Sequence, residues 1–529
     1  MTDTAGMRWT SASPRQEDYR MDSDTEERCP KHARMASRWM ALALSVCCGA
    51  AVAQQSQPSF LFAGYLQRAS IDDPADPLSG GRMVVGGKDI VLPRNLLITM
   101  PGQYLTLQDL FRGPHPGGFG EPLAGVQART GLALDDLPRP ARPVMVQLAG
   151  NIVGGDYVAG LVSIMPQGFN EEGEGSGYIR AIDYVRGELL VGPHPSAAAP
   201  DSALVRVRIN DPQGVYGKRN ADKPGGATMD DRFAVDPGNA SVAAASGFPM
   251  CIPRVASPAN DPRCPMGNRP ADPVLQAWYT CGAVPAVGSV PVHPACDPAR
   301  PVPLVIGDYI VFSGMVVDEA PGSSYFAAHA LQANLSIFTS PGANPAYLFT
   351  EVTIVGTLGE PFPTIDQEQT SRFRIVAFTT DPSRRVDVFA VDVGDNERLL
   401  TVLTPNAVPP LGRLRTTLPA KANFLPVTRD VRIRIRGHTS QKVVGGFLDS
   451  GQYTAPVSEY IAPENLRWGV PRFPVAIPFE NFCFLGKGDG PLTTLGRTAS
   501  LPMIGRLSPF PESGHAFSQP RANGTRSCD

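Results

Sequence analysis

The stretch GDYVAGLV, Gly155–Val162, recurs later in the chain as GDYIVFSG, Gly307–Gly314. In each copy a Gly-Asp pair precedes a run rich in β-branched and aromatic residues. Glycine tolerates positive φ and aspartate hydrogen-bonds its own backbone, so the pair favours a turn. Tyrosine, valine and isoleucine suit a pleated, half-buried surface. Each copy therefore predicts a turn followed by a β-strand, and the glycine within or after the run indicates a bulge or a sharp bend.

A second phrase marks the start of three consecutive units. Gly64-Tyr65 opens the first, Gly177-Tyr178 opens the second, and a looser match, Gly356-Thr357, opens the third. The Gly-Asp-Tyr strand closes the first two units, and SGQY, Ser450–Tyr453, is a candidate to close the third. The spacings differ too much for a named repeat class. We expect an all-β fold of tandem small antiparallel, OB-like barrels, with unit one at 54–165, unit two at 166–340 and unit three at 341–462.

Length and composition agree with this fold class. A chain of 529 residues is long enough for about two to four domains with real cores. The 53 glycines and 54 prolines separate many short apolar runs, which favours strands over helices. Charged residues make up 18% of the chain and the net charge is -3. A nucleic-acid-binding surface would need basic stripes, so we expect no nucleic-acid partner.

Residues 1–53 are predicted to be a leader. The segment 35–53 combines a positive residue, a short apolar run and the A-x-A sequence Ala51–Ala53, which is typical of a secretory signal peptide. The true start is then Met35, and the alternative is a long natural leader. The apolar run is too short to cross a membrane, and we expect no transmembrane span after it. These features predict a secreted or periplasmic protein, with a Pro-rich, partly disordered tail at 463–529.

Several local patterns predict particular elements. Two strand-like runs flank Gly86-Gly87, which predicts a hairpin across 82–92. A short helix is expected at 105–111. Arginines alternate with aliphatic residues in 204–209 and again in 431–436, which predicts two half-buried strands. Between Asp211 and Pro303 the pattern gives way to Pro, Gly, Asn, Asp and Cys, so we interpret 211–303 as one long insertion between two strands of barrel two.

Four cysteines lie within this insertion: Cys251, Cys264, Cys281 and Cys296. An exported chain meets an oxidising compartment, so disulfides are the expected state. Four cysteines allow three pairings. We favour the local pairs Cys251–Cys264 and Cys281–Cys296, because short loops close readily. Zinc would need closer ligand spacing, such as C-x-x-C, and we expect no metal site.

Tests for catalytic motifs yield no candidate catalytic, cofactor-binding or metal-binding residue. The stretch Phe447–Gly451 matches the apolar-apolar-Asp-Ser-Gly pattern of aspartic proteases, whose chemistry needs two carboxylates that share a proton. A second such motif is absent from the sequence, so we interpret this one as a turn. The sequence contains neither G-x-S-x-G nor H-E-x-x-H. The acidic stretch Asp392–Glu397 is oxygen-rich, but its spacing is not that of a calcium loop and favours a solvated turn.

The stretch Asn210–Lys218, at the entrance to the insertion, mixes turn formers with an aromatic residue and a cation. It either anchors the insertion on the barrel or lines a binding cleft, and we favour anchoring. Shallow aromatic faces would indicate binding, and the candidate ligand-face residues are Tyr157, Tyr178, Tyr216 and Trp278.

The opening strand at Gly177–Ile179, the Gly-Asp-Tyr strand at Gly307–Tyr309 and the following Ala330–Asn334 resemble small OB-like barrel domains of unknown function in exported bacterial proteins. The wider pattern is similar to uncharacterised secreted β-rich proteins of bacteria and fungi. The stretches that carry this wider resemblance are Asn151–Gly155, Asn210–Pro212, Gly247–Pro253 and Gly451–Pro456. It covers most of the mature chain and implies neither an activity nor catalytic residues.

These observations favour an exported, non-catalytic binding or structural protein of the cell surface or extracellular space. OB-like barrels characteristically bind extended polymers across one face, so the expected partner is a polysaccharide, a peptide or a protein. The alternative is a secreted hydrolase whose site lies between the insertion and a barrel. Fold analogy alone does not establish function. Carboxylates or a histidine converging in one deep pocket would favour the hydrolase.

Overall fold

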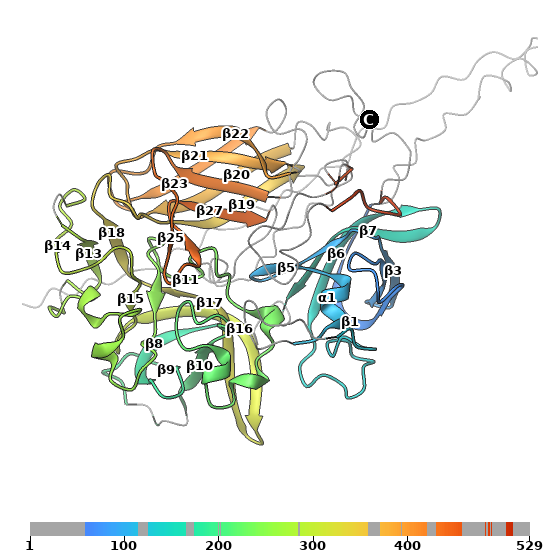
Figure 1. Ribbon diagram of the computed structural model, residues 1–529, viewed down its shortest axis with the longest axis horizontal. Coiled ribbons are helices and arrows are strands. Elements are labelled where there is room, and N and C mark those ends of the chain that lie inside the picture. The colour runs from blue at the N-terminus through green and yellow to red at the C-terminus, as the bar shows by residue number, and fades with distance from the viewer. Residues whose placement is uncertain are drawn as a thin grey trace, which may run out of the picture. The chain divides into compact units, whose positions relative to one another are not determined.

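Strands make up most of the regular structure, with one short α-helix and several 3₁₀ turns among the described residues (Figure 1). The computed structural model describes residues 59–114, 125–165, 174–198, 200, 203–273, 275–283, 286–357, 371–392, 394–419, 430–456, 482, 485–486, 488 and 504–511. The predicted leader at 1–53 lies outside the described residues, as does most of the predicted tail at 463–529. All described residues belong to one compact part of the chain, 57–529. The expected all-β fold class is confirmed.

Unit one forms a closed five-stranded barrel. Its strands pair in the order β3-β2-β1-β6-β7, and β7 closes on β3 through a parallel pair that includes Ile90 and Tyr157. Inward side chains such as Leu66, Met83 and Leu148 are fully buried. The strands are β1 (Ser59–Ile71), β2 (Gly81–Val85), β3 (Lys88–Leu92), β6 (Met145–Val153) and β7 (Asp156–Met165).

Two local predictions in unit one are confirmed. Strands β2 and β3 form the expected hairpin, and Gly86 and Gly87 take φ values of 58° and 74°, which a type I′ turn requires. The short helix is α1 (Leu107–Phe111). It begins after Thr106, whose Oγ1 accepts a hydrogen bond from the Asp109 N–H at 3.1 Å. Two further strands, β4 (Leu97–Met100) and β5 (Gln103–Thr106), extend the sheet beyond β7.

Unit two contains a second barrel with the same strand order. Its strands pair as β10-β9-β8-β16-β17, and β17 closes on β10 through a parallel pair that includes Val207 and Phe326. Ile179, Leu189 and Leu331 belong to its core. The strands are β8 (Glu174–Asp183), β9 (Glu188–Gly192), β10 (Val205–Ile209), β16 (Tyr309–Ala320) and β17 (Ser323–Ala333). The expected tandem of small OB-like barrels is therefore confirmed for units one and two.

The two copies of the Gly-Asp-Tyr phrase form the same local structure at different places in their barrels. Gly155 and Gly307 have φ values of 98° and 97°, so each copy begins with a glycine-dependent turn. The first copy leads into β7, the last strand of barrel one. The second leads into β16, the fourth strand of barrel two, and β17 closes that barrel. The expectation that the phrase closes both units is therefore wrong for unit two. The predicted bulge is present at Gly160, which the pairing of β6 with β7 skips.

Unit three differs from the expected barrel. Its strands form one sheet in the order β19-β20-β23 and another in the order β22-β21-β24-β27, and within the described ranges no strand joins the two. Side chains such as Ile375, Val388 and Ile433 belong to one core, as in a β-sandwich. The strands are β19 (Leu348–Thr357), β20 (Ser371–Thr379), β21 (Val386–Asp392), β22 (Asn396–Leu403), β23 (Arg413–Pro419), β24 (Asp430–Ile435) and β27 (Gln452–Pro456) (Figure 1).

Both predicted arginine-rich strands are present, as β10 and β24. In β24 the aliphatic residues face the core, while Arg432 and Arg434 pair with Glu397 at 2.6 and 2.5 Å. In β10 the arginine face is itself covered, because Arg208 is fully buried. Its guanidinium pairs with Glu188 at 2.6 Å, so the buried charge is compensated.

The insertion between β10 and β16 consists of short elements rather than a barrel. Strand β11 (Val242–Ala244) runs parallel to β17, β12 (Met250–Cys251) pairs with β15 (Val302–Pro303), and β13 (Trp278–Cys281) lies between β14 (Val292–His293) and β18 (Ser336–Thr339). The 3₁₀ turns cover Asn220–Asp222, Gly226–Thr228, Asp231–Phe233, Pro258–Asn260 and Met266–Asn268. A separate small hairpin joins β25 (Lys442–Val443) to β26 (Leu448–Asp449). The disulfides Cys251–Cys264 and Cys281–Cys296 are present, which confirms the predicted local pairing.

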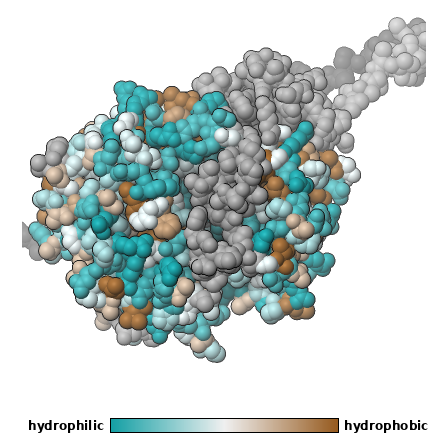
Figure 2. Space-filling view, viewed as in Figure 1, coloured by the Kyte–Doolittle hydropathy of each residue, from teal (hydrophilic) through white to brown (hydrophobic). Residues whose placement is uncertain are grey.

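The described surface on the face drawn in Figure 2 is mainly hydrophilic, with apolar residues in small separate patches. Such scattered patches are ordinary for a protein surface. Among the described residues, no helix is both long enough and apolar enough to cross a membrane.

Candidate functional site

Tyr216 is not available to a ligand, contrary to the prediction that it could belong to an exposed aromatic face. Its side chain is fully buried, and its hydroxyl donates a hydrogen bond to the Asn239 carbonyl oxygen. The Asp211 carboxylate accepts hydrogen bonds from the N–H groups of Val215, Tyr216 and Gly217 at 2.9, 2.7 and 3.0 Å. The stretch therefore anchors the insertion on barrel two, which is the interpretation that the sequence favoured.

The other three predicted aromatic residues lie in two places. Tyr157 belongs to barrel one, where its ring centroid is 5.3 Å from those of Phe60 and Phe62. Tyr178 and Trp278 belong to unit two, Tyr178 on β8 and Trp278 on β13. The structure thus does not bring the four residues to one face. It does place Trp278 in a groove, and Tyr178 against a residue of the same groove.

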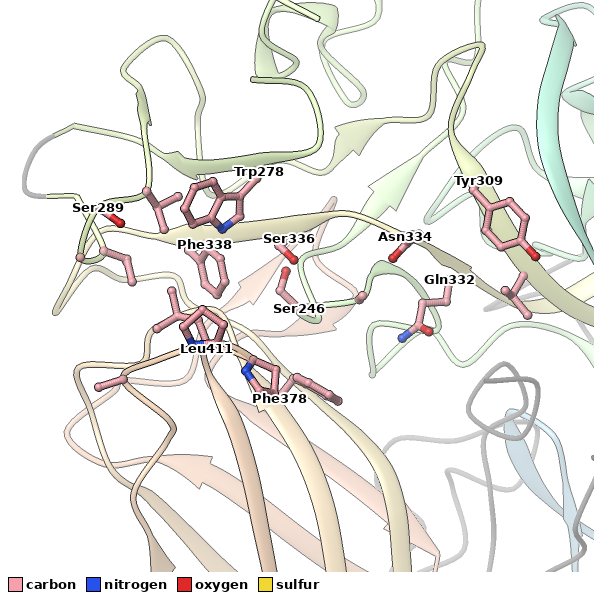
Figure 3. A pocket seen from close by; sticks show the side chains of 18 residues that line it. Ser246, Trp278, Ser289, Tyr309, Gln332, Asn334, Ser336, Phe338, Phe378 and Leu411 are labelled. Atoms are coloured by element: carbon pink, nitrogen blue, oxygen red, sulfur yellow. The ribbon is translucent and has the colours of Figure 1, made fainter. Parts of the chain in front are cut away.

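The floor of this groove follows the chain from β17 into β18. Gln332, Asn334, Ser336 and Phe338 all line it, and they alternate with the buried residues between them (Figure 3). Side chains of an extended chain point to opposite sides in turn, which explains the row. The complete lining is Ala245, Ser246, Trp278, Val287, Gly288, Ser289, Val290, Tyr309, Val311, Gln332, Asn334, Ser336, Phe338, Phe378, Ala407, Pro409, Pro410 and Leu411, and the cavity has a volume of about 680 Å³. That volume is ordinary for a ligand pocket.

Aromatic rings mark two parts of the groove. Trp278 lies opposite Ser336 in the pairing of β13 with β18 and beside Phe338 (Figure 3). The residue is 42% exposed. Tyr309 lies farther along the row, next to Gln332 in the view of Figure 3. The Tyr309 ring packs edge-on against Tyr178, with the ring centroids 5.1 Å apart. Tyr178 thus supports Tyr309 from the neighbouring strand.

The walls come from two segments far apart in the sequence. Val287 and Val290, in the insertion, pack with Phe338 and Leu411 in one small apolar cluster. The loop that carries Val287 and Val290 is closed by the Cys281–Cys296 disulfide. On the other side, Thr339 donates its backbone N–H to the Thr380 carbonyl oxygen at 2.9 Å, which ties β18 to unit three. The groove therefore lies between the insertion, barrel two and loops of unit three.

The described lining of the groove contains no charged residue and no histidine. Its polar groups are the amides and hydroxyls of residues such as Gln332, Asn334 and Ser336. Within the part of the chain that the structure describes, these three side chains form no hydrogen bond. Amides and hydroxyls can both donate and accept hydrogen bonds, so the row is free to serve a ligand with similar groups.

A second depression, of about 580 Å³, is lined by charged residues that form ion pairs with one another. It includes Asp395, Glu397, Arg432, Lys442 and Asp449. Arg432 pairs with Asp395 at 2.9 Å, and Lys442 pairs with Asp449 at 2.8 Å. Burial acts to raise the pKa of Glu397, but hydrogen bonds from Arg434 and Arg432 bring this pKa below its ordinary value. The carboxylates of Asp395, Glu397 and Asp449 thus form ion pairs with basic side chains of the same depression.

This charged depression bears on two motifs that the sequence singled out. The acidic stretch at 392–397 contributes Asp395 and Glu397, whose carboxylates face arginines rather than one another. The Asp-Ser-Gly motif contributes Asp449 to the ion pair with Lys442. Among the described residues, no group of three or more His, Cys, Asp or Glu side chains is placed to hold a metal ion.

Tyr309 and the row from Gln332 to Phe338 were not among the predicted ligand-face residues. A signal for the row is present in the sequence, because QANLSIF alternates polar and apolar residues over Gln332–Phe338 apart from the final aromatic. No such signal connects this row to Leu411 or to Trp278, since the three segments meet only in the folded chain.

Comparisons of the chain with family models, with curated proteins and with solved structures gave no match.

Proposed function

We propose that this protein is an exported, non-catalytic binding protein of the cell surface or extracellular space, and that the groove holds an extended polymer. The observation that carries the proposal is the uncharged row from Gln332 to Phe338, whose amide and hydroxyl side chains form no hydrogen bond among the described residues. The exposed Trp278 and the half-buried Tyr309 lie along this row. Pockets of this kind, apolar with a few placed polar groups, are typical of ligand sites. The two disulfides fit an extracellular or periplasmic protein.

The runner-up is a hydrolase, and one observation favours it: the groove does lie between the insertion and a barrel, where such a site was expected. Hydrolysis of a glycosidic or peptide bond needs an acid, a base or a nucleophile at the reacting atoms. The described lining contains neither a carboxylate nor a histidine that could act in this way. The groove therefore supports binding better than it supports hydrolysis.

The test is a screen of the purified mature chain on glycan and peptide arrays, followed by titration of the hits. Trp278→Ala should weaken binding at least tenfold, because it removes the exposed ring in the groove. Tyr65→Ala is the matched control, since Tyr65 is similarly exposed, at 45%, but lies in barrel one. Binding that survives Trp278→Ala, or turnover of a substrate panel that one point substitution abolishes, would overturn the proposal.

A further inference from the structure

We infer that the polymer held in the groove is an uncharged polysaccharide. This inference rests on the proposed function and adds to it the chemical class of the ligand. Three properties of the groove lead to it: the lack of charge in the described lining, the closed backbone along its floor, and the arrangement of rings and amides above that floor.

The first property concerns charge. A polyanion or polycation is bound mainly through opposite charges, and its affinity falls steeply as salt rises. The described lining offers no charged side chain for this purpose. Desolvating a charged ligand group against these neutral walls would cost free energy without a compensating ion pair. The groove is thus matched to a ligand without formal charge.

The second property concerns the backbone. Extended peptides commonly bind by adding a strand to a free sheet edge, where the main chain supplies the hydrogen bonds. Strand β17 is paired on both sides at Gln332, with Val311 of β16 and with Ala243 of β11. At the outer side of β18 the Ser246 hydroxyl accepts a hydrogen bond from the Ile337 N–H at 3.0 Å and donates one to the Ile337 carbonyl oxygen at 2.6 Å. The floor therefore offers no open edge at these positions, and a ligand must be bound by side chains.

The third property concerns those side chains. A sugar ring has apolar C–H faces and a rim of hydroxyl groups that donate and accept hydrogen bonds. Trp278 and Tyr309 present ring surfaces that can cover apolar faces while their polar tips stay in water. Gln332, Asn334 and Ser336 lie between them in Figure 3 and can each donate and accept. The six steps from Gln332 to Phe338 span at most about 20 Å, long enough for several sugar units.

The experiment uses the purified mature chain and defined probes. Dextran, soluble starch, mannan and mixed-linkage β-glucan are the neutral polysaccharides, alginate and heparin are the charged ones, and a library of uncharged peptides is the third arm. Affinity electrophoresis and calorimetric titration are run at low and at high salt. We expect at least one neutral polysaccharide to bind with an affinity that changes less than about twofold with salt, and longer oligosaccharides to bind more tightly than shorter ones.

Two variants report on the groove without a large effect on folding. Trp278→Ala should weaken binding of the neutral polysaccharide at least tenfold. Asn334→Leu, at an exposed position, should weaken it about threefold to tenfold by removing one donor and one acceptor while keeping a similar shape. Tyr65→Ala should leave the affinity unchanged, and unfolding curves confirm that each variant is folded.

The outcomes separate this inference from the proposed function. If uncharged peptides bind, neutral polysaccharides do not, and Trp278→Ala abolishes the peptide binding, then the groove is a binding site but the ligand class is wrong. If only the charged polymers bind, in a salt-dependent way, the ligand class is also wrong. If nothing binds, or if binding is unaffected by both groove variants, the inference and the proposed function fall together.

Discussion

At the scale of single residues, Asp211 fixes the start of the insertion with one buried carboxylate. Three backbone N–H groups converge on it, from Val215, Tyr216 and Gly217. Asp211→Asn keeps the size of the side chain but removes its charge and directs an NH₂ group toward these donors. We expect the free energy of unfolding to fall by about 2–3 kcal/mol, as for hydrogen bonds to charged groups, in denaturant titrations followed by tryptophan fluorescence.

The matched control for this prediction is Asp222→Asn. Asp222 lies in the same insertion and pairs with Arg219 at 2.9 Å, but its side chain is 49% exposed. Exposed ion pairs contribute little to stability, so this variant should change the free energy of unfolding by less than about 0.5 kcal/mol. Equal effects of the two substitutions would show that Asp211 does not anchor the insertion.

His438 gives the protein a pH dependence that can be assigned to one side chain. Its Nε2 accepts a hydrogen bond from the Ala346 N–H at 3.1 Å, which requires a neutral ring. Burial, assisted by the nearby Arg384, lowers the pKa of His438 to about 4 from 6.5. Between these values the unfolded chain binds more protons at this site than the folded chain. The stabilising contribution of His438 is therefore present above about pH 6.5 and is lost as the pH falls toward 4.

His438→Gln should remove this dependence while keeping a hydrogen-bond acceptor. The measurement is the difference in free energy of unfolding between wild type and variant across the same pH window. That difference should change by at most about 1.4 kcal/mol per pH unit, the value for one proton, with the wild type losing more stability in acid. Burial raises the pKa of Asp236 to about 6, which acts in the opposite sense, but Asp236 is present in both proteins and cancels. A flat difference would contradict the assignment.

At the scale of elements, the buried Ser246 satisfies the backbone groups on the outer side of β18. Ser246→Ala would leave the N–H and carbonyl groups of Ile337 without these two hydrogen bonds. Because buried unsatisfied groups are costly, the free energy of unfolding should fall by about 1–3 kcal/mol. An opened edge is also a template for strand pairing, so self-association should increase in light-scattering measurements. Ser289→Ala, at an exposed position of the same groove, should have neither effect.

Elements whose structure depends on local physics could be predicted from the sequence. The Gly86-Gly87 hairpin, the short helix after Thr106 and the turn at Gly155 and Gly307 all follow from residues adjacent in the chain. The same locality explains the error about the repeated phrase. A glycine turn followed by a β-forming run makes the same structure before a fourth strand as before a fifth, so the phrase does not report its place in the barrel.

Local sequence patterns do not show which distant strands pair with one another. In unit three the alternating run at 431–436 was predicted as a strand, and it forms β24. Whether the strands of this unit close a barrel or form two facing sheets depends on which strand pairs with which, and on the curvature of each sheet. Tyr216 shows the same limit for a single residue. The sequence offered it both as a candidate ligand-face residue and as part of an anchoring stretch, and the folded chain buries it completely.

At the scale of the whole molecule, the groove is the feature that the sequence revealed least. Trp278 comes from the insertion, Gln332 from barrel two and Leu411 from a loop of unit three. Of these, Trp278 was among the four aromatic residues that the sequence offered as a candidate ligand face. The others are ordinary residues whose role depends on being brought together. The disulfides, by contrast, were predictable, because each closes a short loop within the insertion.

Removing each disulfide in turn can distinguish effects on the stability of the insertion from effects on ligand binding in the groove. They close segments of similar length, with sequence separations of 13 for Cys251–Cys264 and 15 for Cys281–Cys296. In the chain-entropy account a loop of this size contributes about 3 kcal/mol, so replacing either pair by alanines should lower the free energy of unfolding by a similar amount. Ligand affinity should not respond equally, because only the Cys281–Cys296 loop carries groove residues, Val287 through Val290.

We therefore expect the Cys281→Ala, Cys296→Ala double variant to bind the groove ligand several-fold more weakly than wild type. Its wall would no longer be held in place before binding, and ordering that wall would then oppose association. The Cys251→Ala, Cys264→Ala double variant should bind with wild-type affinity, since no residue of that loop lines the groove. Titrations of both variants at a temperature where each is folded decide the matter. Equal losses of affinity would mean that the insertion acts as one rigid body, and unchanged affinity in both would mean that the Val287–Val290 wall takes no part in binding.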